Sequence, residues 1–263
     1  MTYIVLLILG LCFGSFVNAL VWRLHNKRDF VKERSECVRC HHVLAWNDLV
    51  PVLSWILLKG KCRYCHKPIS KQYPLIELLM AILFVTSYVL WPLGFALVGW
   101  VLFGLWLVCL IFLVALAIYD ARWMLLPDSL MFPLIGIGVV FGFIRWFGLD
   151  EMTIVETIVQ LALGAASIGG VYYLLYAVSK GAWVGFGDVK LGIFMGVVLG
   201  WQAGLLALVL ANIIGLIIIL PGLMTKKLSR TSRVPFGPFL IAAFVIAGLI
   251  SERAIDWYLS VLL

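Results

Sequence analysis

The chain has 263 residues, of which 64% are hydrophobic and 13% are charged. A mean hydropathy of +1.10 excludes an ordinary soluble domain and predicts a membrane protein. The net charge is +7, but the basic residues gather in loops beside apolar segments. This pattern indicates a membrane topology signal and not a nucleic-acid-binding face, so we expect contact with lipid and no nucleic-acid partner.

Apolar segments follow one another along the whole chain, and no internal repeat stands out between them. The first begins without a basic region or a small-residue cleavage site, so we expect a retained helix and not a removed signal peptide. The sixth is short for a spanning helix, so we expect it to be tilted or broken. The sequence predicts an all-α polytopic membrane protein with about eight transmembrane helices, at residues 2–22, 74–91, 95–118, 129–147, 154–178, 188–200, 202–222 and 236–252.

The distribution of lysine and arginine predicts the orientation of these helices. With the segments placed alternately across a membrane, eighteen of the twenty basic residues fall on one side, and only Arg145 and Arg253 fall on the other. Loops rich in lysine and arginine stay in the cytoplasm, so we expect both termini on the periplasmic side. Eleven of the eighteen lie between Arg23 and Lys71; the rest are Arg122, Lys180, Lys190, Lys226, Lys227, Arg230 and Arg233.

Cysteine pairs mark the long basic loop, residues 25–72. Cys37 and Cys40 form one C-x2-C pair, Cys62 and Cys65 form a second, and 21 residues separate the pairs. Four thiolates in a tetrahedron suit Zn²⁺ and leave no open position, which indicates a structural site. The reducing cytoplasm disfavours disulfides. We therefore predict a small zinc-ribbon-like loop. Neighbouring histidines could replace one ligand but are expected to be solvated: His41, His42 and His66.

Two aspartates lie at the ends of apolar segments on the same predicted membrane face. Asp120 closes the third segment, and Asp188 opens the sixth after Gly185 and Gly187. An ionised carboxylate beside the hydrocarbon core is costly and usually marks a relay or a catalytic group. Two carboxylates at one depth could activate water for attack on a peptide carbonyl. The alternatives are a proton or ion relay, or helix capping by Asp188.

Two further acids belong to the same predicted face. Asp128, followed by Ser129, is expected to cap the fourth segment. Glu77 follows Tyr73-Pro74 at the start of the second segment, where it could cap that helix, pair with Arg23 or contribute to a site. These interpretations stay open on the sequence alone.

Five ordered blocks and the cysteine pairs resemble the type IV prepilin peptidases, a family of bacterial inner-membrane GxGD aspartic proteases with eight spanning helices. The blocks are Gly14-Ser15-Phe16-Val17-Asn18 with Arg23, Tyr73-Pro74-Leu75-Ile76-Glu77, Asp120-Ala121-Arg122 leading to Leu126-Pro127-Asp128, Gly185-Phe186-Gly187-Asp188-Val189-Lys190, and Pro235-Phe236-Gly237-Pro238.

The resemblance implies that Asp120 and Asp188 are the catalytic pair. It implies removal of a short basic leader from type IV prepilins or type II secretion pseudopilins, typically after glycine. S-adenosylmethionine-dependent methylation of the new N-terminus would follow. The candidate methyl-donor residues near the cytoplasmic face are Asn18, Arg23 and Glu77.

Two other classes of function compete with a protease. A proton-coupled transporter would need more polar residues deep in the apolar segments, and a zinc-ribbon assembly factor gives no reason for Gly-x-Gly before a membrane-edge acid. We expect three parts in the chain: residues 1–24 as the first transmembrane helix, 25–72 as the zinc loop and 73–263 as the protease core.

Overall fold

The computed structural model describes residues 1–29, 33–225 and 234–262, with backbone alone for residues 254–259 and 261–262. In these ranges the regular structure is helical, apart from two isolated β-bridges. The all-α membrane class is thereby confirmed. Among the residues that the structure describes, six helices are long and apolar enough to cross a membrane, so the number eight stays a prediction. Five basic residues used for the orientation lie outside the described residues: Lys32, Lys226, Lys227, Arg230 and Arg233.

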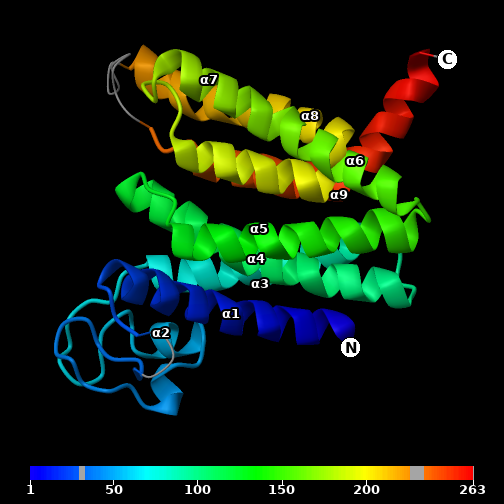
Figure 1. The fold of residues 1–263 in the computed structure, drawn as a ribbon. Coiled ribbons are helices and arrows are strands. Elements are labelled where there is room, and N and C mark those ends of the chain that lie inside the picture. The colour runs from blue at the N-terminus through cyan, green and yellow to red at the C-terminus, as the bar shows by residue number, and fades with distance from the viewer. Residues whose placement is uncertain (30–32, 226–233, 263) are drawn as a thin grey trace. The chain divides into compact units, whose positions relative to one another are not determined.

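The chain forms two compact units, Met1–Val89 and Leu90–Leu263. In the first unit, helix α1 (Thr2–His25) packs on α3 (Gln72–Leu90) (Figure 1). A Cβ on Gly10 or Gly14 would lie 2.5 Å from a Cα of α3, so this G-x-x-x-G spacing is what lets the two backbones approach.

The cysteine-rich loop joins α1 to α3 and contains two short helices, η1 (Trp46–Asp48) and α2 (Leu53–Leu57). By packing, α3 belongs with α1 and this loop. The predicted three-part division concerns the role of each segment and stays a prediction.

The second unit is a bundle whose centre is aromatic. The Trp106 ring stacks on Phe244 with centroids 5.1 Å apart, and the Phe194 ring centroid lies 5.2 Å from that of Phe244. The elements in chain order are α4 (Leu97–Trp123), α5 (Asp128–Phe143), the π-helical turn η2 (Ile144–Leu149), α6 (Ile154–Ala165), the π-helical turn η3 (Ala166–Gly170), α7 (Val171–Ser179), α8 (Phe186–Met224) and α9 (Gly237–Leu262).

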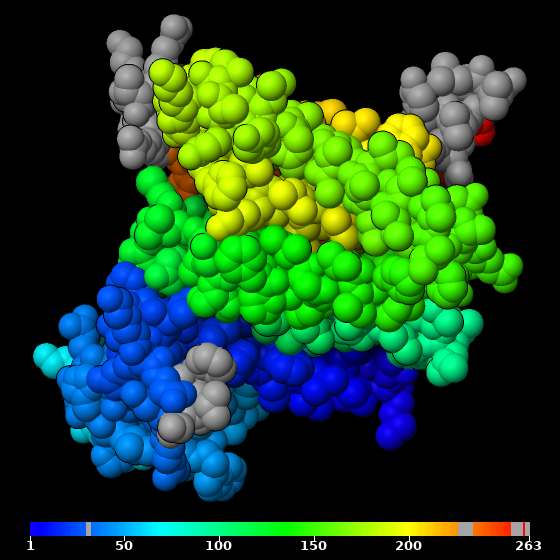
Figure 2. All heavy atoms as spheres, in the orientation of Figure 1, coloured from blue at the N-terminus to red at the C-terminus, as the bar shows by residue number. Residues whose placement is uncertain are grey.

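Helix α8 is broken at Gly200, whose φ of 79° and ψ of 173° are not helical. Ile168 lies beside both Gly192 and Gly204, so the chain reverses at the break. Figure 1 shows the yellow first part and the orange second part running in opposite directions. The predicted boundary between the sixth and seventh apolar segments falls at this residue. In Figure 2 the yellow first part lies between α5 and the yellow-green α6 and α7.

Gly196 permits a close approach between the backbones of α8 and α6. A Cβ on Gly196 would overlap the carbonyl oxygen of Gly164, and backbone cannot move aside as a side-chain tip can. We expect Gly196→Ala to lower the free energy of unfolding by about 1–3 kcal/mol, as overpacking does elsewhere. Thermal unfolding in detergent would measure this. Gly104→Ala is the control, because a Cβ there meets nothing within 4 Å. Equal melting temperatures for the two variants would contradict the prediction.

Candidate active site and metal centre

Asp120 lies in the last turn of α4 and is buried, with 6% of its surface exposed. Its Oδ2 accepts a hydrogen bond of 2.9 Å from the backbone N–H of Gly237, at the start of α9. A Cβ on Gly237 would lie 2.8 Å from that oxygen, so a glycine is what lets the amide reach the carboxylate. Gly237 therefore belongs to the candidate site. The sequence did not reveal this contact, although Gly237 lies in the block Pro235–Pro238.

Asp188 occupies the third position of α8, whose N-cap is Gly185. The backbone N–H of Gly185 donates to Asp188 Oδ2 at 3.1 Å, so the carboxylate closes the helix start without being the N-cap itself. The expectation that Asp188 could itself be the N-cap of this helix is therefore wrong. Asp188 also lies within electrostatic range of the Asp120 carboxylate. The Asp188 side chain therefore both caps the start of α8 and lies near a second acid.

The start of α8 packs against the connector between α4 and α5, residues 124–127. A Cβ on Gly187 would lie 3.0 Å from the Leu126 side chain, so the bare backbone packs directly on that residue. An ion pair three residues further along α8 reinforces this contact, because Lys190 Nζ lies 2.5 Å from Asp128 Oδ1. Asp128 was expected to cap the fourth segment, but the N-cap of α5 is Pro127 and Asp128 pairs with Lys190.

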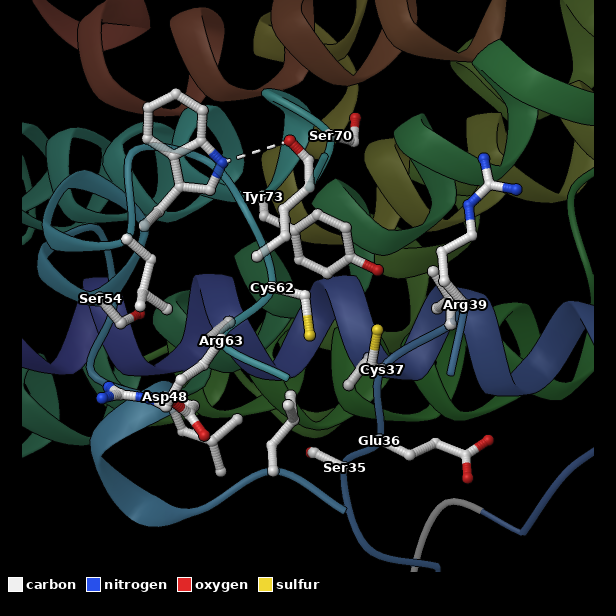
Figure 3. A pocket seen from close by; sticks show the side chains of 18 of the residues that line it. Ser35, Glu36, Cys37, Arg39, Asp48, Ser54, Cys62, Arg63, Ser70 and Tyr73 are labelled. Atoms are coloured by element: carbon white, nitrogen blue, oxygen red, sulfur yellow. Dashed lines mark hydrogen bonds and ion pairs between the residues drawn. The ribbon is translucent and has the colours of Figure 1, made fainter. Parts of the chain in front are cut away.

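In the first unit, the four cysteines of the loop lie together. Their Sγ atoms are all within 4.8 Å of one another, and those of Cys37 and Cys65 are 4.0 Å apart. A tetrahedral zinc–thiolate site with bonds of about 2.3 Å has sulfur–sulfur edges of about 3.8 Å. The group can therefore hold a metal ion after small adjustments. Figure 3 shows the sulfurs of Cys37 and Cys62 pointing toward one another.

Each cysteine pair sits in a turn of the same construction. The amide N–H of His41 donates to Cys37 O at 2.9 Å, and that of His66 donates to Cys62 O at 2.9 Å. Both histidines have φ of 56°, in the left-handed region. The two cysteine pairs, which the sequence already showed as C-x2-C twice, therefore form two turns of matching geometry. The shared string Cys-x-x-Cys-His was the signal for it.

The loop also contains polar contacts that lower the pKa of one cysteine and hold the second cysteine turn in place. Burial tends to raise the pKa of the Cys37 thiol, but hydrogen bonds from the amides of Cys40 and Arg39 lower it to about 7. A lower pKa favours the thiolate, which is the metal-binding form. Asp48, which the sequence did not single out, accepts hydrogen bonds from Arg63 at 2.7 Å and Tyr64 at 3.0 Å. Burial tends to raise the pKa of Asp48, but these bonds outweigh it and lower that pKa.

A cavity of about 280 Å³ lies between α1, the loop and the start of α3 (Figure 3). Arg23 and Glu77 line it, and they are 8% and 6% exposed. Glu77 Oε2 accepts a hydrogen bond of 2.7 Å from the backbone N–H of Val52. Asn18 is not among the lining residues; its Nδ2 donates to Tyr73 O at 3.2 Å and so ties α1 to the start of α3.

Comparison with known proteins matches both parts of the chain to one family. Residues 8–91 match the bacterial peptidase A24 N-terminal domain, and residues 107–220 match the type IV leader peptidase family. A prepilin leader peptidase/N-methyltransferase of Stutzerimonas stutzeri is 32% identical to this chain, over 97% of the chain and 92% of the relative. The chain belongs to the type IV leader peptidase family. No solved structure matches it.

Other leader peptidases show similar agreement. The prepilin leader peptidase/N-methyltransferase of Dickeya chrysanthemi is 33% identical over 96% of this chain and 93% of its own length. That of Xanthomonas campestris pv. campestris is 32% identical over 95% and 92%. The matched leader-peptidase region contains both Asp120 and Asp188, and the matched N-terminal region contains all four clustered cysteines.

Proposed function

We propose that the protein is a membrane aspartic endopeptidase that removes the leader of type IV prepilins or pseudopilins, with Asp120 and Asp188 as its catalytic pair. The observation that carries the proposal is geometric: two acids at separate helix ends are each held by a backbone amide, and they lie close enough for their charges to influence one another. Membership of the leader peptidase family and the names of the relatives support the substrate. The family does not favour the transporter or the assembly factor.

The two carboxylates divide the proton transfers of peptide hydrolysis. One of them, ionised, takes a proton from water while the water oxygen bonds to the scissile carbonyl carbon. The other, protonated, gives its proton to the carbonyl oxygen. Collapse of the tetrahedral intermediate then breaks the C–N bond. The leaving amine takes the proton that the first carboxylate received from water, and a hydroxyl group of the intermediate returns a proton to the second carboxylate. Each aspartate uses Oδ2 for its backbone contact, so we assign Oδ1 to proton transfer.

Cleavage of a purified prepilin by the protein in proteoliposomes tests this function. Mass spectrometry is expected to show one released leader and one mature product. The absence of both products with folded, correctly inserted protein would contradict the proposal.

We propose that Cys37, Cys40, Cys62 and Cys65 bind a structural Zn²⁺. The close approach of four sulfurs and the two matched turns support this assignment. Four thiolates complete a tetrahedral shell, so the ion would hold the loop together and take no part in hydrolysis.

We propose that the aspartates face the cytoplasm in the bacterial inner membrane, with both termini periplasmic. The division of basic residues supports this orientation. Within the second unit, Lys190 lies beside the aspartate end. Arg145 pairs with Glu252 at 3.3 Å, away from that end.

We propose that the cavity of the first unit binds S-adenosylmethionine, with Arg23 and Glu77 as contacts and Asn18 as a residue that positions α1. When bound, the donor supplies an electrophilic methyl group. It carries a sulfonium, an amine, a carboxylate and an adenine, and the cavity offers the buried acid Glu77 and the buried base Arg23. Its walls also include the rings of Trp22, Trp55 and Tyr73.

Equilibrium binding of S-adenosylmethionine to the purified protein tests this site. We expect Glu77→Gln to weaken binding by about tenfold, because a carboxylate facing a cation contributes on the order of 1.4 kcal/mol more than an amide. The amide oxygen can still accept the Val52 hydrogen bond, so the loop stays folded. Glu151→Gln, at an exposed acid, is the control. Equal affinity of the wild type and Glu77→Gln would contradict the assignment.

A further inference from the structure

Tyr172 lies just after the π-helical turn η3, at the start of α7. A π-helical turn inside a helix is rare, and such turns are frequent at functional sites. The turn rotates the following residues relative to a continuous α-helix. Tyr172 is buried here, with 3% of its surface exposed, whereas its neighbour Tyr173 is 57% exposed.

The tyrosine ring lies between the elements that hold the two aspartates. A Cβ on Gly192 would lie 3.2 Å from Tyr172 Cδ2, and Gly192 follows Asp188 by about one helical turn, on the same face of α8. On the other side, the Phe236 ring centroid is 6.1 Å from that of Tyr172. Phe236 directly precedes Gly237, whose amide binds Asp120. Tyr172 is also within electrostatic range of Asp188.

The hydroxyl of Tyr172 is buried and has no hydrogen-bond partner in the part of the chain that the structure describes. An unsatisfied buried hydroxyl costs about 1–3 kcal/mol, and phenylalanine would fill the same space without that cost. A tyrosine at this position therefore makes physical sense if a ligand supplies the missing acceptor.

We propose that the Tyr172 hydroxyl is a catalytic hydrogen-bond donor to the carbonyl oxygen of the scissile peptide. This rests on the proposed endopeptidase function. The hydroxyl keeps its proton throughout: it donates a hydrogen bond that strengthens as negative charge develops on the carbonyl oxygen. The proton transfers stay with Asp120 and Asp188.

Tyr172→Phe tests the proposal, because it removes one oxygen atom and keeps the ring contacts with Phe236 and Gly192. We expect kcat for prepilin cleavage to fall about 100-fold, as on removal of one oxyanion donor, with KM within about twofold. Tyr173→Phe, on the exposed side of the same helix, is the matched control and is expected to cleave at the wild-type rate. Wild-type kcat in Tyr172→Phe would overturn the proposal.

Two further measurements separate this role from a structural one. The thermal stability of Tyr172→Phe is expected to equal or exceed that of the wild type, because an unsatisfied buried group is removed; reduced stability accompanying the lost activity would overturn the proposal. The pH dependence of kcat is expected to keep its midpoints, with kcat lowered by the same factor at every pH. A shift of those midpoints would overturn the proposal and would instead show that Tyr172 positions Asp188. Failure of the wild type itself to cleave would reject the endopeptidase function, whereas full activity of Tyr172→Phe rejects this inference alone.

Discussion

Asp120→Asn and Asp188→Asn are each expected to reduce kcat for prepilin cleavage by at least about 1,000-fold, within the range seen when a general acid or base is removed. Asparagine has the size of aspartate and can still accept the hydrogen bond from Gly237 or Gly185, but it cannot exchange a proton at neutral pH. The fold and the position of the side chain should therefore survive while the chemistry is lost. Single-turnover cleavage of a purified prepilin measures the effect.

The control for both variants is Asp150→Asn, at an exposed acid outside the aspartate site. Its rate is expected to match that of the wild type. Near-wild-type cleavage by Asp120→Asn or Asp188→Asn would show that the residue is structural and would remove it from the proposed catalytic pair.

Removal of the metal is expected to unfold the cysteine-rich loop while the membrane helices stay folded. Structural zinc sites contribute about 10–16 kcal/mol at neutral pH, and the described part of this loop contains only short helices besides its cysteine turns. A chelator, or Cys62→Ser, should make residues 35–70 sensitive to limited proteolysis. Binding of S-adenosylmethionine should be lost as well, because Cys37 and Cys62 line the proposed cavity.

Cys12→Ser provides the matched control for the metal prediction, because Cys12 lies in α1 apart from the cluster. Its metal content and its digestion pattern are expected to equal those of the wild type. A loop that resists protease equally with and without metal would show that the ion does not hold it.

The sequence predicted the parts of this protein that depend on local patterns. Apolar runs predicted the helices, because a segment within a membrane must pair its backbone N–H and C=O groups by hydrogen bonds inside the segment itself. The C-x2-C pairs predicted the cysteine cluster, because two residues between ligands fit one tight turn. Gly200 ends the sixth apolar segment at the break in α8, where only the shortness of that segment hinted at an interruption.

Contacts between distant segments could not be predicted in the same way. Nothing near Asp120 in the sequence points to the Gly237 amide, and nothing near Asp128 points to Lys190. Tyr172 looks like an ordinary core aromatic until its hydroxyl is seen without a partner among the described residues. These features arise from packing between helices, which a periodic pattern does not encode.

The most direct test of the catalytic pair is a double-mutant cycle on kcat, with wild type, Asp120→Asn, Asp188→Asn and the double variant measured on one prepilin. When two residues act as a unit, removing one of them costs about as much activity as removing both. The double variant is therefore expected to retain about the same residual rate as either single variant. Losses that multiply in the double variant would mean that Asp120 and Asp188 act independently, and the account of a shared acid–base site would be wrong.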